Sequence, residues 1–124
     1  MKFMIKILIT GGAGNVGGAL ARKLVENQKY FVVIADDLST GSKDKLPSLK
    51  YNNWSFVYCD VNKYEEISQI MLVHQFDYVF HYAAVVGVKR TQENPIMVLN
   101  DIQGIKNILQ LSKNTSAKRV FFSS

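Results

Sequence analysis

Five of the chain's eight glycines lie in one stretch, GGAGNVGG, at residues 11–18. An apolar run at 4–10 leads directly into this stretch, and apolar residues at helical spacing follow it. The glycines therefore lie between an expected strand and an expected helix. Because glycine has no Cβ, it lets the backbone turn tightly and lets another group come close to the main chain. This stretch constrains the fold most, since the strand must turn at once into the helix.

Five short apolar segments, rich in β-branched and aromatic residues, are expected to form strands. Their hydrophobicity is nearly continuous, which is typical of strands buried on both faces of a parallel sheet that helices cover. The segments are 4–10, 30–35, 54–59, 78–82 and 119–122.

Three segments between these strands carry apolar residues at helical spacing. The first begins near Asn15 and has on one face Val16, Ala19, Leu20 and Leu24. The second is 63–74, with Ile67, Ile70 and Met71, and the third is 95–113, with a stripe of Leu99, Ile102, Ile105, Ile108 and Leu109. Residues 39–53 are polar and are expected to form a long loop. This order predicts an α/β fold, a doubly wound parallel sheet of about five strands between two layers of helices.

Composition limits the classes of function. The chain has 124 residues, enough for one domain with a core, and no apolar run reaches the roughly 18 residues that would span a membrane. The net charge of +5 is spread over short basic pairs, which favours solvated surface over a nucleic-acid interface. The single cysteine, Cys59, lies in an expected buried strand, excludes an internal disulfide and fits a cytoplasmic protein.

The glycine stretch is suited to hold a diphosphate. Gly11 and Gly14 would let the main chain approach the anion, and the N–H groups and dipole of the helix start would face it. Gly17 would let the helix pack closely on the first strand. Asp36 ends the second strand, 19 residues after Gly17, where a carboxylate can accept hydrogen bonds from the ribose hydroxyls of adenosine. It would repel a 2′-phosphate, which favours NAD over NADP; the alternative is an aspartate that caps a turn.

Two further segments are candidates for the same site. Asp60 follows the third strand and could accept a hydrogen bond from an adenine amino group, with Val61 supplying backbone contacts. The alternative for Asp60 is an N-cap of the helix at 63–74. The small residues Ala83 and Ala84 at the end of the fourth strand would let a cofactor lie against the main chain.

The two histidines indicate no catalytic or metal site. His81 ends a buried strand and is expected to be a packed core residue, and His74 is expected on the surface. No cluster of His, Cys, Asp and Glu has the pattern of a metal site.

The ordered motifs resemble those of the extended short-chain dehydrogenase/reductases, specifically the NAD-dependent nucleotide-sugar epimerases and dehydratases, whose type member is UDP-glucose 4-epimerase. TGGAGNVG resembles the family's TGxxGxxG, DDLSTG its DNLSTG, CDV its GD(I/V) and HYAA its HxAA. LNDIQGIKNIL resembles NxxxGTxNLL, and KRVFFSS resembles the strand that leads to the catalytic serine. Two departures are Asn15, where the family usually has Phe or Tyr, and Ile105, where it has Thr.

The resemblance implies a Rossmann-type sheet in three layers, α/β/α, incomplete at its C-terminal edge, and a set of NAD-binding residues. Asn15 and Val16 would contact the pyrophosphate, and Asp36 the adenosine ribose. The adenosine end would also be lined by Asp37, Leu38, Ser39, Thr40 and Gly41, with Asp60 and Val61 beside the adenine. Under the nicotinamide half would lie Tyr82, Ala83, Ala84, Val85 and Val86. Asn100 would help to order the site, and Ser123 would also belong to the cofactor-binding residues.

The resemblance also implies where catalysis would occur. Family members use a Ser or Thr and a Tyr-x-x-x-Lys pair, in which the lysine helps to hold the tyrosine as a phenolate. None of the six tyrosines here has Lys four positions later, and the catalytic Ser or Thr is expected just after Ser124. We therefore expect residues 1–124 to be an N-terminal NAD-binding domain without its substrate domain.

The resemblance implies that the substrate of the full-length protein is a nucleotide-sugar, with UDP as its nucleotide, and that the protein forms a homodimer, as members of the family commonly do. Lys89 and Arg90 could approach such a substrate, although solvated surface is favoured for both. The alternative function is a non-catalytic NAD-binding sensor or interaction module.

Overall fold

The computed structural model describes residues 4–83, 95–115 and 117–122. Its strands and helices alternate, and all strand pairs are parallel. The strands are β1 (Ile5–Thr10), β2 (Tyr30–Asp36), β3 (Trp54–Tyr58), β4 (Tyr78–His81) and β5 (Arg119–Phe122). The α-helices are α1 (Asn15–Leu24), α2 (Tyr64–His74) and α4 (Pro95–Asn114), and one 3-10 turn, η1 (Lys43–Lys45), lies in the long loop before β3.

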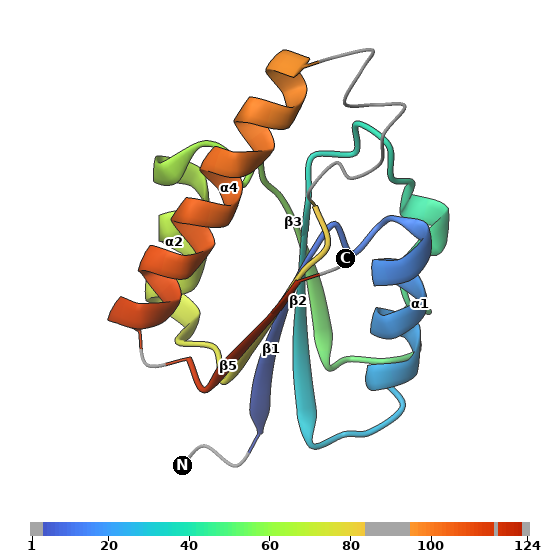
Figure 1. Ribbon diagram of the computed structural model, residues 1–124. Helices are drawn as coiled ribbons and strands as arrows, with labels where there is room; N and C mark the ends of the chain where they lie inside the picture. The colour runs from blue at the N-terminus through green and yellow to red at the C-terminus, as the bar shows by residue number, and fades with distance from the viewer. Residues whose placement is uncertain (1–3, 84–94, 116, 123–124) are drawn as a thin grey trace.

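The five strands form one sheet in the order β3-β2-β1-β4-β5. Helix α1 lies on one face, and α2 and α4 lie together on the other (Figure 1). The predicted Rossmann-type, doubly wound, three-layer architecture is therefore confirmed. Because all strands are parallel, their carboxyl ends meet at one edge of the sheet, where open α/β sheets bind ligands.

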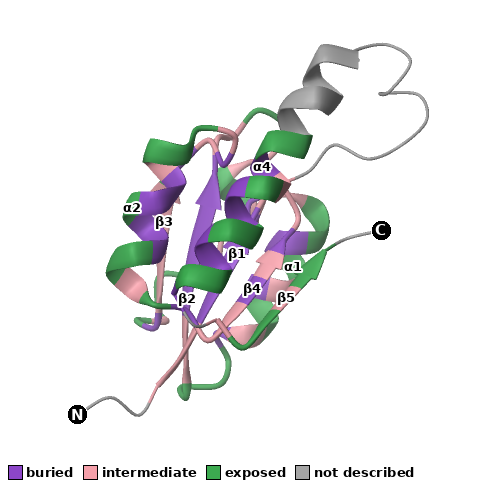
Figure 2. Cartoon of the chain, turned by 60° about the vertical axis from the view of Figure 1, so that its left-hand side comes forward, coloured by how far each residue is buried: buried purple, intermediate pink, exposed green. Residues whose placement is uncertain are grey.

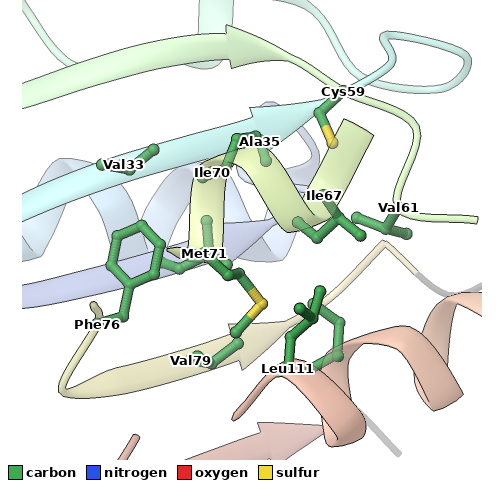
Figure 3. Close-up of a cluster of buried hydrophobic side chains, with 12 residues drawn as sticks. Val33, Ala35, Cys59, Val61, Ile67, Ile70, Met71, Phe76, Val79 and Leu111 are labelled. Carbon is green, nitrogen blue, oxygen red and sulfur yellow. The ribbon is translucent and has the colours of Figure 1, made fainter. Parts of the chain in front are cut away.

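Side chains of the central strands alternate between two apolar cores. On the α1 face, Ile7, Ile9, Val32 and Ile34 pack with Ala21 and Val25. On the other face the core joins the sheet to α2 and α4, through residues that include Val33, Val79, Ile67, Met71 and Leu111 (Figure 3). The two cores cover both faces of β1 and β2, which explains why these strands read as continuous apolar runs.

The expectation that all five strands are buried on both faces is wrong for the two edges. Strand β3 is only half-buried, with Tyr58 exposed, and β5 is largely exposed (Figure 2). An edge strand has a neighbour on one side only, so its side chains are covered less well than those of β1 and β2.

Two of the predicted helix faces are wrong in part. In α1, Leu20 and Leu24 pack against the core as predicted, but Val16 and Ala19 are exposed, whereas Gly17, Gly18 and Ala21 face the protein. In α4, Ile108 is buried as predicted, but Ile102 and Leu109 are 44% and 48% exposed. The other buried positions among its described residues are Gly104, Asn107, Leu111 and Ser112. Helix α1 packs closely on the glycine turn through Gly17, and α4 reaches the main chain of Val61 through the Asn107 side chain. Small or hydrogen-bonding residues suit such close contacts better than large apolar ones.

Candidate dinucleotide-binding site

The glycine stretch forms a tight turn between β1 and α1 (Figure 1). Gly11 has φ +70°, and a Cβ there would lie 2.7 Å from the carbonyl carbon and oxygen of Tyr82. Glycine is the residue that adopts this left-handed conformation without steric cost. A Cβ on Gly17 would collide with the Gly11 carbonyl oxygen, so Gly17 lets α1 pack against the turn itself.

The first turn of α1 has no side chain that neutralises it. Gly14 is the N-cap in extended conformation and provides no side-chain hydrogen bond, and the turn contains no acidic residue. Backbone N–H groups at a helix start lack partners within the helix and carry the positive end of its dipole. Asn15 and Val16 are exposed there. This end of α1 therefore has the properties of an anion-binding site.

Thr10 and His81 link the glycine turn to the end of β4. The Thr10 hydroxyl accepts hydrogen bonds from the backbone N–H groups of Tyr82 at 3.1 Å and Ala83 at 3.3 Å. The hydroxyl also hydrogen-bonds to His81 Nδ1, 2.7 Å away, and His81 Nε2 is buried with no partner among the described residues. Burial lowers the pKa of His81 to about 4, so the ring is neutral. Sequence reasoning missed Thr10. Its only signal is that the apolar run at 4–10 contains two polar residues, Lys6 and Thr10.

Asp36 lies at the carboxyl end of β2, 7% exposed, beside the glycine turn. Its Oδ2 accepts a hydrogen bond from Ala13 N at 3.0 Å, and its Oδ1 accepts one from Leu38 N at 2.7 Å. The second bond is the turn cap that the sequence left as an alternative. Each carboxylate oxygen can accept more than one hydrogen bond, so this cap leaves acceptor capacity for a ligand.

The loop after Asp36 folds over the glycine turn. Asp37 accepts a hydrogen bond from Ser39 N at 3.0 Å, and Leu38 has φ +61°. A Cβ on Gly41 would lie 2.8 Å from Asp36 Oδ2, so the loop returns to the carboxylate. Ser39 and Thr40 are exposed at its tip.

Asp60 follows β3 and organises the loop to α2. Its Oδ1 accepts a hydrogen bond from Asn62 N at 3.0 Å, and its own N–H donates to Glu66 Oε1 at 3.0 Å. The alternative that Asp60 is the N-cap of the second helix is wrong, because Lys63 occupies that position without a side-chain cap. Val61 is buried in the core beside Ile67 (Figure 3).

Cys59 and His74 support no catalytic role. Burial, reinforced by Glu66, Asp60 and Asp37, raises the pKa of Cys59 to about 12, so the thiol stays protonated. His74 was expected on the surface but is half-buried, with its ring stacked near Phe31 and Phe76 at centroid distances of 6.5 and 5.3 Å. Burial lowers its pKa.

The structure brings most of the predicted residues to one edge of the sheet. The glycine turn, Asp36 with its loop, Asp60 and the half-buried Tyr82 and Ala83 all lie at or beyond the carboxyl ends of the strands. Other predicted residues lie outside the described part: Ala84, Val85, Val86 and Ser123, and also Lys89, Arg90 and Ser124. Asn100 is within α4, but its side chain is not described.

The described residues contain neither a candidate metal site nor a candidate membrane span. No group of three or more His, Cys, Asp and Glu side chains there could hold a metal ion. None of the described helices combines the length and the apolar character that crossing a membrane requires.

The fold and the site define a dinucleotide-binding α/β protein, and comparisons with known proteins narrow this class. A profile of the NAD dependent epimerase/dehydratase family matches residues 7–124. The chain is 32% identical to a putative UDP-glucose 4-epimerase of Methanocaldococcus jannaschii, over 95% of this chain and 37% of that protein. It is 35% identical to a UDP-N-acetyl-alpha-D-glucosaminuronate decarboxylase of Bacillus cytotoxicus, over 96% of this chain and 36% of that protein.

A solved structure agrees with these relatives. The UDP-glucose 4-epimerase of Thermotoga maritima with UDP-glucose superposes with a TM-score of 0.87 at 31% identity, over 97% of this chain and 38% of that one. The chain thus spans a little more than a third of the length of these proteins. It belongs to the NAD dependent epimerase/dehydratase family, and the predicted cofactor, NAD, is the cofactor of that family.

Proposed function

We propose that this chain is the NAD-binding part of an enzyme that acts on a nucleotide-sugar, and that it is a single domain. The observation that carries the proposal is the Asp36 carboxylate, which is buried against the glycine turn and fixed by Ala13 N and Leu38 N. A carboxylate in this place favours a ribose with free 2′- and 3′-hydroxyls. Because the chain resembles both an epimerase and a decarboxylase, the proposal does not specify which reaction the enzyme carries out on the sugar.

The proposal assigns each part of the cofactor to residues that the structure describes. The pyrophosphate would lie on the uncapped start of α1, where Asn15 and Val16 are exposed. Asp36 would accept hydrogen bonds from the adenosine ribose, and the loop 37–41 would cover this end. Asp60 would face the adenine, and Val61, whose side chain is in the core, would contribute backbone contacts. Tyr82 and Ala83, held by the Thr10 hydroxyl, would lie under the nicotinamide half.

Binding of NAD would supply the hydride acceptor and donor for transient oxidation of the sugar. The protein residues expected to move the hydroxyl proton are a tyrosine and the lysine four positions after it, and no such pair occurs in this sequence. We propose that those groups and the sugar-binding residues belong to the remaining length of a protein of this family. The chain by itself would bind NAD without turnover.

A homodimer of the full-length protein is part of the proposal. Ile102 and Leu109 are exposed apolar residues seven positions apart on α4, and therefore share one face of that helix. Contact between copies through this face would cover both residues.

The test is titration of the chain with NAD and NADP by calorimetry. We expect NAD to bind more tightly, and Asp36→Ala to weaken NAD about tenfold to a hundredfold, as for lost hydrogen bonds to a charged group. NADP should lose less, because it gains from removal of the negative charge. Asp44→Asn, which changes an exposed carboxylate on η1, is the matched control and should leave both affinities unchanged. Tighter binding of NADP, or equal losses for the two cofactors, would contradict the role of Asp36.

A further inference from the structure

Helix α4 contacts the loop after β3 through Asn107 and Gly104. Asn107 is 2% exposed, and its Nδ2 donates a hydrogen bond of 2.9 Å to the carbonyl oxygen of Val61. One turn earlier, a Cβ on Gly104 would lie 2.5 Å from Asn62 Oδ1 and 3.0 Å from a Val61 methyl. The absence of a side chain at Gly104 therefore lets the helix come close enough for Asn107 to reach the loop.

The Asn107 amide can adopt only one orientation in this network. Gln103 Nε2 donates a hydrogen bond of 2.9 Å to Asn107 Oδ1. With its oxygen engaged by Gln103, the amide presents its NH2 group to the loop. The Val61 carbonyl thus receives a buried, well-oriented donor.

The peptide group between Val61 and Asn62 connects Asn107 to Asp60. Its carbonyl oxygen accepts from Asn107, and its N–H, which belongs to Asn62, donates to Asp60 Oδ1 at 3.0 Å. Hydrogen bonds at the two ends of one peptide group fix its plane and polarise each other. The direction of the Asp60 carboxylate is therefore set partly by a residue on α4, 47 positions later in the sequence.

We propose that Asn107 is a positioning residue for the adenine end of the bound cofactor. It holds the Val61–Asn62 peptide so that Asp60 Oδ1 is occupied and Oδ2 is directed to the 6-amino group of adenine. The inference rests on the proposed placement of adenine beside Asp60. It also gives a reason for the buried asparagine in α4, where an apolar residue would fill the same space but leave the Val61 carbonyl without a donor.

The test compares NAD with its hypoxanthine analogue, nicotinamide hypoxanthine dinucleotide, in which a 6-oxo acceptor and a protonated N1 replace the 6-amino donor and the free N1 of adenine. The measured quantity is the ratio of the two dissociation constants for the same chain. General losses of stability and changes at the pyrophosphate or ribose affect both ligands and cancel in this ratio. For the unmodified chain we expect NAD to bind about tenfold more tightly, the value of one hydrogen bond to a carboxylate.

Asn107→Leu keeps the approximate volume of the side chain and removes the donor, so the ratio should fall to about threefold or less as Asp60 loses its fixed orientation. Thr115→Val is the matched control, because it removes another buried hydrogen bond at the end of the same helix, from Thr115 Oγ1 to Leu111 O. The control should lower stability and leave the ratio unchanged. A folded Asn107→Leu chain with the ratio of the unmodified chain would overturn the inference.

A second measurement needs no variant and decides the matter if Asn107→Leu does not fold. In ¹H–¹⁵N spectra of the unmodified chain, NAD should shift the side-chain amide signals of Asn107 more than the hypoxanthine analogue does. Equal shifts would overturn the inference. Failure of the unmodified chain to bind NAD would instead refute the proposed function, so the two failures are distinguishable.

Discussion

The two ends of the sheet use the same device for different purposes. At the amino ends, Asn53 and Asp77 hold neighbouring chain segments through hydrogen bonds to the main chain. At the carboxyl ends, Thr10, Asp36 and Asp60 do the same. In each case a short polar side chain fixes a loop that the strands alone would not define.

The two ends of the sheet differ in the hydrogen-bonding capacity that remains for a ligand. The Asn53 amide donates to the carbonyl oxygens of Val25, Asn27 and Tyr30, and its oxygen accepts from Gln28. At the carboxyl ends, the Asp36 carboxylate keeps acceptor capacity and the start of α1 has no side-chain cap. A buried group that is saturated contributes stability alone, whereas a fixed group with remaining capacity can also bind. Substitutions at the amino end should therefore change stability, and those at the carboxyl end should change affinity as well.

The largest effect is expected at the amino end, for Asn53→Asp. The new carboxylate would be buried against three carbonyl oxygens, and an uncompensated buried charge costs about 3–5 kcal/mol of unfolding free energy. Urea denaturation at neutral pH measures this loss. Asn52→Asp, at the exposed neighbouring position, should change stability by less than about 0.5 kcal/mol. Similar losses of unfolding free energy for the two variants would show that the three carbonyl contacts do not matter. A weaker NAD affinity of folded Asn53→Asp would contradict the contrast between the two ends of the sheet.

At the carboxyl end, Thr10→Val should lower both stability and affinity. The variant removes the acceptor of Ala83 N and leaves His81 Nδ1 buried without its hydrogen-bond partner, while Tyr82 N keeps the carbonyl oxygen of residue 10. We expect a cost of about 3 kcal/mol. NAD affinity should also fall, because the main chain proposed to lie under the nicotinamide loses its anchor. Thr10→Ser keeps the hydroxyl and should lose only about 1 kcal/mol for the missing methyl group. Unchanged NAD affinity in Thr10→Val would show that this anchor serves stability alone.

The sequence predicted the arrangement of the elements better than the contacts between them. Apolar runs located all five strands, because main-chain pairing in a buried sheet depends on hydrophobicity that is visible locally. The face of α4 was predicted only in part, with Ile108 correct, because Gly104 and Asn107 face the interior through contacts with a loop more than 40 residues earlier, which no local pattern encodes. His74 was expected on the surface but is half-buried for a related reason, because its ring stacks near Phe31 of β2 and near Phe76, which follows α2.

The site was predictable where one residue type is suited to one chemical task. Glycine at a strand–helix turn and an aspartate at the end of β2 carry recognisable chemistry, and the structure places them together. The role of Thr10 was not predictable, since a threonine in an apolar run equally suits an ordinary buried strand. Its function depends on the imidazole of His81, which becomes its neighbour only when β1 and β4 pair.

His81 gives the carboxyl end a pH dependence of its own. The folded-state pKa, about 4, is below the unfolded value of 6.5, so the unfolded chain binds more protons between these values. The resulting stability is present above pH 6.5 and is lost as the pH falls toward 4, amounting to about 2 kcal/mol between pH 7 and 5. His81→Asn retains an acceptor near the Nδ1 position and cannot titrate. Its unfolding free energy should fall less steeply in this interval; equal slopes would mean that other groups, such as His74, dominate.

The smallest effects distinguish the two residues with left-handed backbone, one at each end. Gln75, with φ +56°, is the C-cap of α2 and lies at the amino ends of the strands. Leu38, with φ +61°, lies in the loop after Asp36, at the carboxyl ends. Gln75→Gly should raise the unfolding free energy by about 0.5–1 kcal/mol, because glycine relieves the strain at a helix end. NAD affinity should be unchanged, since the proposed site lies at the opposite end of the sheet.

Leu38→Gly relieves the same strain, but it also frees the loop that carries the N–H donor to Asp36 Oδ1. The bound cofactor must then order that loop, which should weaken NAD about two- to fivefold even if the variant is no less stable. Calorimetric titration of both variants measures the contrast. If Leu38→Gly binds NAD as tightly as Gln75→Gly does, the loop is ordered without the strained residue. The distinction between a saturated end and a binding end would then rest on Asp36 and the start of α1 alone.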